Sequence, residues 1–167
     1  MARNGWRWPL MSGEWGEKWE FRLIPPLIGE FERPLDHAGR LVLPPDFRHK
    51  LGDVAVLSQE REGCLAIRTS EKFAAWTEKI LGGDETAAGR NRLRYLARYS
   101  RDAKIDSHGR VAIPDAYREF ARVEERGPVL LVGAIDRVEL WNPSRWEEII
   151  GTQESRRLFE GVDVSNT

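Results

Sequence analysis

A fourteen-residue segment occurs twice in this chain, and this repeat constrains the fold more than any other feature of the sequence. Residues 35–48 read LDHAGRLVLPPDFR and residues 105–118 read IDSHGRVAIPDAYR, at a constant offset of 70 residues. Five of the fourteen positions are identical, and four more are conservative swaps between large apolar or aromatic side chains, at 35/105, 41/111, 43/113 and 47/117. The repeat indicates a tandem duplication of one small unit. Neither copy could bury its apolar face alone, so we expect the two copies to form one compact domain.

The order of the expected elements is also the same in both copies. The weaker matches are residues 54–57 with 129–132, at an offset of 75, and residues 67–73 with 140–146, at an offset of 73. Each copy predicts a strand, a short helix, a strand hairpin and a closing helix. The closing helices are expected over residues 70–81, with Ser70 as N-cap, and over residues 143–150, with Asn142 in the capping position. The predicted fold class is α+β, with two hairpin-and-helix units related by a pseudo-twofold axis.

The D-x-x-G-R sequence in each repeat has the composition of a tight turn. Aspartate can cap a turn through its side chain, and glycine accepts the positive φ that closes it. In the strand that follows, side chains alternate between two faces, so Leu41 and Leu43 share one face and Arg40 lies on the other. The second copy repeats this alternation with Arg110. If the larger apolar residues face the core, both arginines point outward.

The extent of the repeat and local composition set the expected boundaries. These are an N-terminal extension at 1–26, a first unit at 27–82, a basic helical linker at 83–104, a second unit at 105–151 and an acidic flexible tail at 152–167. The linker predicts a helix from Gly89 to Arg101, and residues 90–104 hold six cationic side chains against Asp102 alone. Four of the seven tryptophans fall within the first 19 residues. We expect that extension to be disordered or to reflect a start assigned too early, with packing of its tryptophans on a partner as the alternative.

Charge and composition exclude several classes of protein. Lys plus Arg is 26 and Asp plus Glu is 27, so the net charge of −1 excludes a uniformly basic nucleic-acid coat but not a local basic patch. The single cysteine, Cys64, is expected in the core, and the three histidines lack metal-ligand spacing, so no metal or cofactor is expected. No apolar run reaches the ~20 residues of a membrane span. Common catalytic motifs are absent, so we expect a cytoplasmic protein that is not an enzyme and has no small-molecule substrate.

The turn arginines favour nucleic-acid binding. A guanidinium on a short rigid hairpin can donate two hydrogen bonds to guanine O6 and N7, or it can bind phosphate. The alternative is structural, because an aspartate and an arginine that flank a glycine turn often form a local ion pair. The duplication alone does not decide between the two, since a duplicated fold also duplicates its turn.

The paired segments LDHAGRLVLP and IDSHGRVAIP resemble the repeated D-x-x-G-R signature of MraZ proteins, relatives of the AbrB/SpoVT swapped-hairpin class. Residues 28–31 and 131–141 also resemble that family, so the resemblance runs from about Leu27 to Ile150. It implies tandem AbrB/SpoVT-like units, a ring-shaped homo-oligomer and a bacterial transcriptional regulator at the nucleoid. It further implies binding to repeated G-rich operator boxes in double-stranded DNA, upstream of the division and cell-wall gene cluster and of the regulator's own gene.

The resemblance also implies which residues contact DNA. By motif position these are the two turn arginines, with the turn aspartates as their companions. The full set expected at the DNA is Asp36, His37, Gly39, Arg40, Asp106, His108, Gly109 and Arg110. Ala38 stands where the family often has lysine, which removes one expected cationic contact from the first turn.

Other arginines have different expected roles. Arg48 and Arg118, in the short helices, are expected to bridge structurally rather than to touch DNA. The linker arginines either contact phosphates or form the solvated face of a helix. The candidates for phosphate contact are Arg90, Arg94, Arg98 and Arg101.

The alternative function is an AbrB-type antitoxin-like module that binds both DNA and a protein partner. Such chains normally carry a single D-x-x-G-R copy, so the two copies in this chain argue against it.

Overall fold

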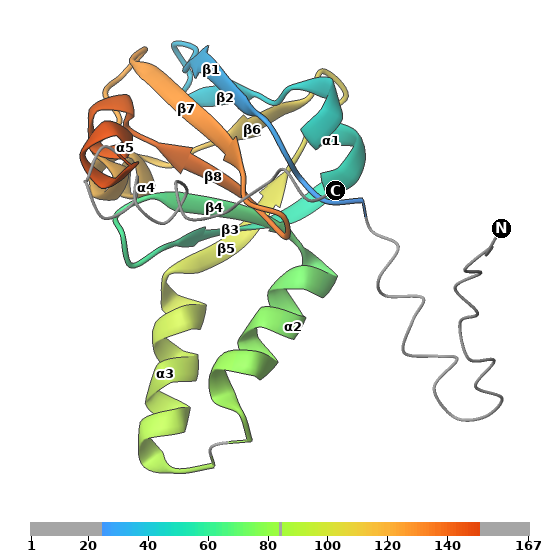
Figure 1. Ribbon diagram of the computed structural model, residues 1–167, viewed down its shortest axis with the longest axis vertical. Helices are drawn as coiled ribbons and strands as arrows, with labels where there is room; N and C mark the ends of the chain where they lie inside the picture. The colour runs from blue at the N-terminus through green and yellow to red at the C-terminus, as the bar shows by residue number, and fades with distance from the viewer. Residues whose placement is uncertain (1–24, 84, 151–167) are drawn as a thin grey trace, which may run out of the picture.

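Two antiparallel sheets and five helices make up the described part of the chain (Figure 1). This computed structural model describes residues 25–83 and 85–150, and the predictions for residues 1–24 and 152–167 lie outside them. The strands are β1 (Glu30–Pro34), β2 (Arg40–Val42), β3 (Val54–Gln59), β4 (Leu65–Thr69), β5 (Ser100–Lys104), β6 (Arg110–Ala112), β7 (Pro128–Gly133) and β8 (Val138–Trp141). The helices are α1 (Pro45–Leu51), α2 (Ser70–Leu81), α3 (Ala87–Arg98), α4 (Asp115–Ala121) and α5 (Pro143–Ile150).

The two units exchange strands. The six-stranded sheet has the order β1-β7-β8-β4-β3-β5, and the second sheet pairs β2 with β6. β1 of the first unit therefore pairs with β7 of the second, with Phe31 opposite Leu131. In return β5, which lies in the predicted linker and is the repeat equivalent of β1 before the second turn, pairs with β3 of the first unit, with Asp102 opposite Val56. Because each unit completes the sheet of the other, neither unit forms this core alone.

A pseudo-twofold axis passes through the β2–β6 ribbon, the name used here for Arg40–Val42 and Arg110–Ala112. Leu41 lies opposite Val111, and these two positions are equivalent in the repeat. The backbone N–H of Leu43 donates to the Gly109 carbonyl, and the backbone N–H of Ile113 donates to the Gly39 carbonyl, both at 2.9 Å. Each of these bonds is the image of the other at the offset of 70 residues. The symmetry fits a tandem duplication.

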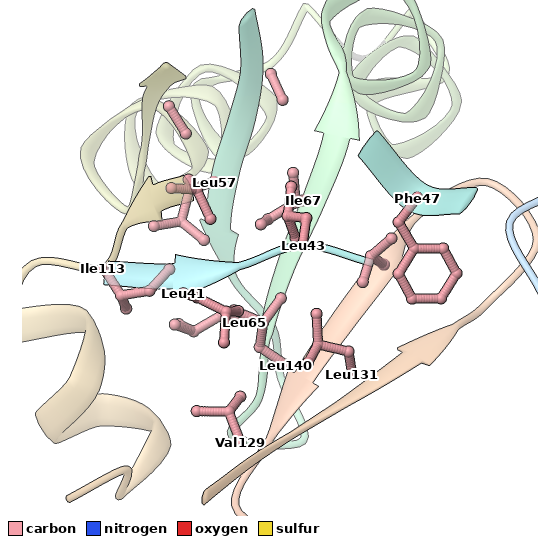
Figure 2. Packing of buried hydrophobic residues seen from close by; sticks show 14 of the residues in the cluster. Leu41, Leu43, Phe47, Leu57, Leu65, Ile67, Ile113, Val129, Leu131 and Leu140 are labelled. Carbon is pink, nitrogen blue, oxygen red and sulfur yellow. The ribbon is translucent and has the colours of Figure 1, made fainter. Parts of the chain in front are cut away.

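The alternation predicted for the repeated strands is confirmed. Leu41 and Val111 are fully buried, whereas the side chains of Arg40 and Arg110 are about one-third exposed. The buried side chains join one cluster that both units build (Figure 2). Full burial of one leucine contributes about 1.5–3 kcal/mol relative to leaving it exposed. Burial of the apolar face therefore fixes which way the arginines point.

The structure corrects the offset of 75 that the sequence suggested for the next strand. Ser58 lies opposite Ser100, and Val132 lies opposite Glu30, which is the repeat equivalent of Ser100, so the offset is 74. Matching Val54 to Val129 is wrong because Val54 is 51% exposed and Val129 only 2%. A slip of one residue in a strand moves each side chain to the opposite face.

Two local predictions are also wrong. The predicted helix over residues 89–101 ends at Arg98, and Ser100–Lys104 is strand β5, which occupies the edge of the sheet beside β3. The pairing with β3 takes these residues out of the helix. The N-cap of α2 is Thr69, whose hydroxyl oxygen accepts a hydrogen bond from Lys72 N–H, and not Ser70.

Helices α2 and α3 project together as an arm from one end of the six-stranded sheet (Figure 1). None of the twelve residues of α2 is buried, and in α3 only Gly89 is. The face of the six-stranded sheet that points away from the main cluster carries a smaller apolar cluster beneath α5. Trp141 packs in this smaller cluster, and Cys64 is buried there, as predicted. In the described part of the chain, no helix is long and apolar enough to cross a membrane.

Candidate nucleic-acid interface

Each repeat forms a tight turn immediately before its ribbon strand. In the first turn, Gly39 N–H donates to the Asp36 carbonyl at 3.0 Å, and in the second, Gly109 N–H donates to the Asp106 carbonyl at 2.9 Å. The two glycines have φ of +68° and +75°, which residues with a side chain rarely adopt. The turn predicted from D-x-x-G-R is therefore present in both copies.

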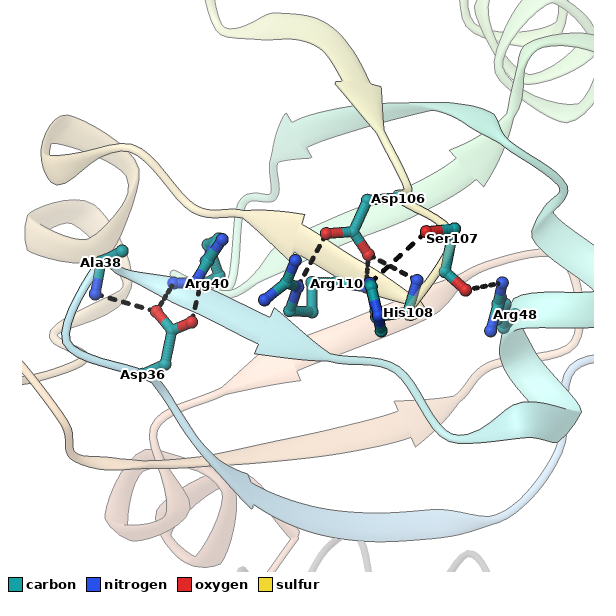
Figure 3. Close-up of polar contacts among 8 residues, drawn as sticks. All are labelled: Asp36, Ala38, Arg40, Arg48, Asp106, Ser107, His108 and Arg110. Carbon is teal, nitrogen blue, oxygen red and sulfur yellow. Dashed lines mark hydrogen bonds and ion pairs between the residues drawn. The ribbon is translucent and has the colours of Figure 1, made fainter.

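The turn aspartate organises the backbone and the arginine together (Figure 3). One Asp36 carboxylate oxygen accepts from the backbone N–H groups of Ala38 and Arg40, each at 2.9 Å, and the other accepts from Arg40 Nε at 2.8 Å. In the second turn Asp106 accepts in the same way from the backbone of His108 and from the backbone and Nε of Arg110. The local ion pair expected under the structural interpretation is thus present.

These bonds also set the charge of the aspartates. The backbone hydrogen bond from Arg110, followed by the bond from its side chain, lowers the pKa of Asp106 to about 2 against the opposing effect of desolvation. The equivalent bonds from Arg40 lower the pKa of Asp36. Both carboxylates are therefore ionised at neutral pH, and each holds its arginine through Nε.

The ion pair leaves the outer edge of each guanidinium available. Among the described residues, no oxygen accepts a hydrogen bond from an Nη group of Arg40 or Arg110. Arginine donates to planar acceptors most effectively as a two-pronged fork. The structural interpretation and the binding interpretation are therefore compatible, because the aspartate orients the side chain without occupying its outer Nη groups.

The two arginines lie on one exposed face. Arg40 is opposite Ala112 and Arg110 is opposite Val42, so all four side chains share the face of the β2–β6 ribbon away from Leu41. Val42 and Ala112 are exposed and small. Diagonal neighbours on adjacent antiparallel strands are about 7–8 Å apart, and this is the separation of the two arginine positions. The ribbon thus presents a narrow surface with two oriented cations.

The remaining turn residues from the sequence prediction lie beside this face. His37 and His108 are exposed on the turns themselves, and His108 Nδ1 is 3.4 Å from the Ser107 hydroxyl. Gly39 and Gly109 are buried within their turns. The structure places the eight predicted residues in two turns at opposite ends of the β2–β6 ribbon, and their contact with DNA stays a prediction.

Arg48 and Arg118 bridge structurally, as expected, but each reaches the turn of the other unit. Arg48 Nη2 donates to the Ser107 carbonyl at 2.5 Å. Arg118 lies against Gly39 and pairs with Asp115. The sequence analysis missed this crossing. The available signal was the identity of these two arginines at equivalent repeat positions.

The structure separates the linker arginines from the turns. Arg90, Arg94 and Arg98 recur every four residues and so follow one face of α3, which contains no acidic residue, and Arg101 is exposed on β5. α3 precedes β5, and the second turn follows it. The length of β5, about 16 Å at 3.3 Å per residue, therefore separates the end of α3 from the second turn. Three of the four arginines predicted to contact phosphate thus lie on the arm, and Arg101 lies beyond its end on β5.

The described residues include no cluster of three or more His, Cys, Asp or Glu side chains that could hold a metal ion. The turn aspartates, the only acidic residues at this surface that the sequence singled out, are already occupied by backbone and guanidinium donors.

The chain matches known proteins over most of its length. A family model described as "MraZ protein, putative antitoxin-like" matches residues 27–93 and 98–162. The "Transcriptional regulator MraZ" of Cutibacterium acnes is 36% identical over 128 residues, which is 76% of this chain and 89% of that protein. Proteins of the same name from Deinococcus radiodurans and Thermus thermophilus are 34% and 32% identical, over 77% and 81% of this chain and 89% and 97% of their own lengths. The repeated signature, its two equivalent turns and these matches show that the chain belongs to the MraZ family.

Proposed function

We propose that this chain is a transcriptional regulator that binds DNA in a sequence-specific manner through the exposed face of the β2–β6 ribbon. The observation that carries the proposal is the pair of arginines Arg40 and Arg110, each held through Nε by its turn aspartate while about one-third of its side chain is exposed. The relatives named as transcriptional regulators support the same class of function.

The dimensions of the ribbon suit the major groove. A groove about 12 Å wide admits a two-stranded β-ribbon, and an arginine fork matches guanine O6 and N7. The separation of the two arginine positions, about 7–8 Å, is close to two base steps of about 3.4 Å. Val42 and Ala112 are small enough to let the ribbon approach the base edges. Because both arginine forks match guanine, G-rich boxes are the proposed target.

The finer points of the proposal follow the family resemblance. We propose that the strand exchange is the AbrB/SpoVT-like swapped hairpin, that copies of the chain assemble into a ring, and that the ring binds repeated boxes. The proposed sites lie upstream of the division and cell-wall gene cluster and of the regulator's own gene. Arg90, Arg94 and Arg98 on the arm and Arg101 on β5 are proposed to contribute phosphate contacts.

The test is binding of the purified full chain to DNA upstream of its own gene. Arg40→Ala and Arg110→Ala are each expected to weaken binding by about 1–3 kcal/mol, roughly 5- to 150-fold, because each removes one bidentate base contact. Arg61→Ala is the matched control, since Arg61 is an exposed arginine in the β3–β4 turn. If both turn variants bind as the wild type and the control do, the ribbon does not read DNA.

An antitoxin-like module is the second candidate, because the description of the matching family model contains that term. It predicts a protein partner whose toxicity the chain suppresses. The test is co-expression: a neighbouring gene that arrests growth alone and is neutralised by this chain would support it. Growth arrest that the chain leaves unchanged would contradict it.

A further inference from the structure

We infer that Arg48 and Arg118 are positioning residues that act crosswise. Arg48, from the first unit, sets the turn that presents Arg110, and Arg118, from the second unit, sets the turn that presents Arg40. This inference rests on the proposed function, because it concerns how the two reading arginines are held.

The first contact runs from α1 to the second turn. The Arg48 guanidinium donates from Nη2 to the Ser107 carbonyl at 2.5 Å (Figure 3). The stem of the same side chain lies over Gly109, where an added Cβ would come within 3.0 Å of Arg48 Cδ. Arg48 therefore covers the turn between the aspartate and the arginine that it orients.

The second contact runs from α4 to the first turn, and Arg118 stands at the repeat position equivalent to Arg48. The Arg118 guanidinium lies so close to Gly39 that a Cβ there would overlap it. The Arg118 side chain is only 14% exposed, and its ion pair with Asp115 fixes its direction. In both turns the glycine has a positive φ, and the arginine of the other unit lies against it.

Most of what fixes each turn from outside comes from the other unit. The Gly109 carbonyl accepts from Leu43 N–H, and the Gly39 carbonyl accepts from Ile113 N–H, each at 2.9 Å. The opposite unit therefore makes two contacts with each turn, one from a backbone N–H just after its ribbon strand and one from the arginine side chain of its short helix. A reading arginine on a fixed turn loses less conformational entropy on binding, so a loosened turn is expected to bind more weakly.

The alternative role for Arg48 and Arg118 is direct contact with DNA phosphates, and salt dependence separates the two roles. A phosphate contact contributes about 0.9 to the slope of log affinity against log salt. A positioning residue leaves that slope unchanged when it is replaced. The affinity lost by a positioning variant should also depend on whether its own reading arginine is present.

The experiment is a pair of double-mutant cycles on operator binding by the full chain. Arg48→Gln is expected to weaken binding by about fivefold or more in the wild type and in Arg40→Ala, but to have little further effect in Arg110→Ala. Arg118→Gln is expected to show the mirror pattern, with its effect lost in Arg40→Ala. Equal effects of Arg48→Gln in both backgrounds, or a slope reduced by about 0.9, would overturn the inference.

A second measurement uses the free protein, so it does not depend on DNA binding. In amide NMR spectra, Arg48→Gln should shift the signals of Ser107 and Gly109 more than those of His37 and Gly39. Unchanged signals from the second turn would count against the crosswise positioning role of Arg48. If Arg48→Gln folds poorly, Arg48→Lys replaces it, because lysine keeps an aliphatic stem and the charge. Arg48→Lys should show the same coupling to Arg110 in the double-mutant cycle. If Arg40→Ala and Arg110→Ala bind operator DNA as the wild type does, the proposed function fails. If Arg48→Gln still shifts the amide signals of the second turn in that case, the crosswise positioning of the turn is supported independently.

Discussion

Gly39→Ala should destabilise the fold more than its backbone conformation alone explains. The φ of Gly39 is +68°, and an alanine forced into the left-handed region costs about 1–2 kcal/mol. Its Cβ would also overlap the guanidinium of Arg118, a side chain only 14% exposed. The overlapping Nη1 atom is the far end of a flexible side chain, so the guanidinium can move aside, and the further cost is the Arg118–Asp115 ion pair, at most about 1 kcal/mol. The combined loss expected is about 2 kcal/mol.

Urea unfolding of the full chain measures this loss, and two controls separate its parts. Gly82 has φ of +51° with open space around its Cβ position, so Gly82→Ala should cost only the backbone part, about 1–2 kcal/mol. In an Arg118→Ala background the overlap is gone, and Gly39→Ala should fall to the same value. The reasoning is refuted if Gly39→Ala costs no more than Gly82→Ala, or if removing Arg118 leaves its cost unchanged.

Three further predictions concern charge and burial. The Asp106 carboxyl should titrate near pH 2 by carbon NMR. Because this folded pKa lies below the ordinary 3.8, the stabilising effect of the ionised carboxylate is present above about pH 4 and is lost as the pH falls through 2. A midpoint near 3.8 would contradict the turn geometry. Leu41→Ala, at a fully buried site, should lower the free energy of unfolding by about 3–5 kcal/mol, whereas Val42→Ala, 46% exposed, should change it by less than about 0.5 kcal/mol in the same urea experiment. Glu60→Ala should cost about 3–5 kcal/mol because it leaves the buried Arg68 uncompensated, and adding Arg68→Met should recover most of that loss in thermal melts.

Local chemistry accounts for the parts of the site that the sequence could predict. Asp36 and Gly39 specify a turn without help from distant residues, and the alternation after Arg40 follows from a period of two. The face that is buried then determines where the arginine points. Since all three signals lie within eight residues, reading them requires no knowledge of topology.

The parts that could not be predicted are those that depend on distant pairing. Nothing in the residues of β5 names β3 as its neighbour, and Arg101 reads locally as the end of a basic helix. The exchange of β1 and β5 is visible only when both copies are placed in space. The crosswise reach of Arg48 and Arg118 has the same origin, because the strand exchange brings each short helix beside the opposite turn.

The strand exchange also has a consequence for how the halves of this chain could have diverged. Two separate copies would need to meet in solution, and their association would weaken on dilution. Covalent linkage through the arm replaces that encounter with an intramolecular one, whose effective concentration does not fall on dilution.

Covalent linkage also frees each half from serving as its own partner. The position that holds Trp141 in the second unit holds Arg68 in the first, where the guanidinium stacks over Trp76 at 4.2 Å and pairs with Glu60. A symmetric dimer would have to carry the same residue at both places. Fusion therefore lets one half keep an apolar surface under its helix while the other builds a charged one, and the two D-x-x-G-R turns stay in a fixed one-to-one ratio at any cellular concentration.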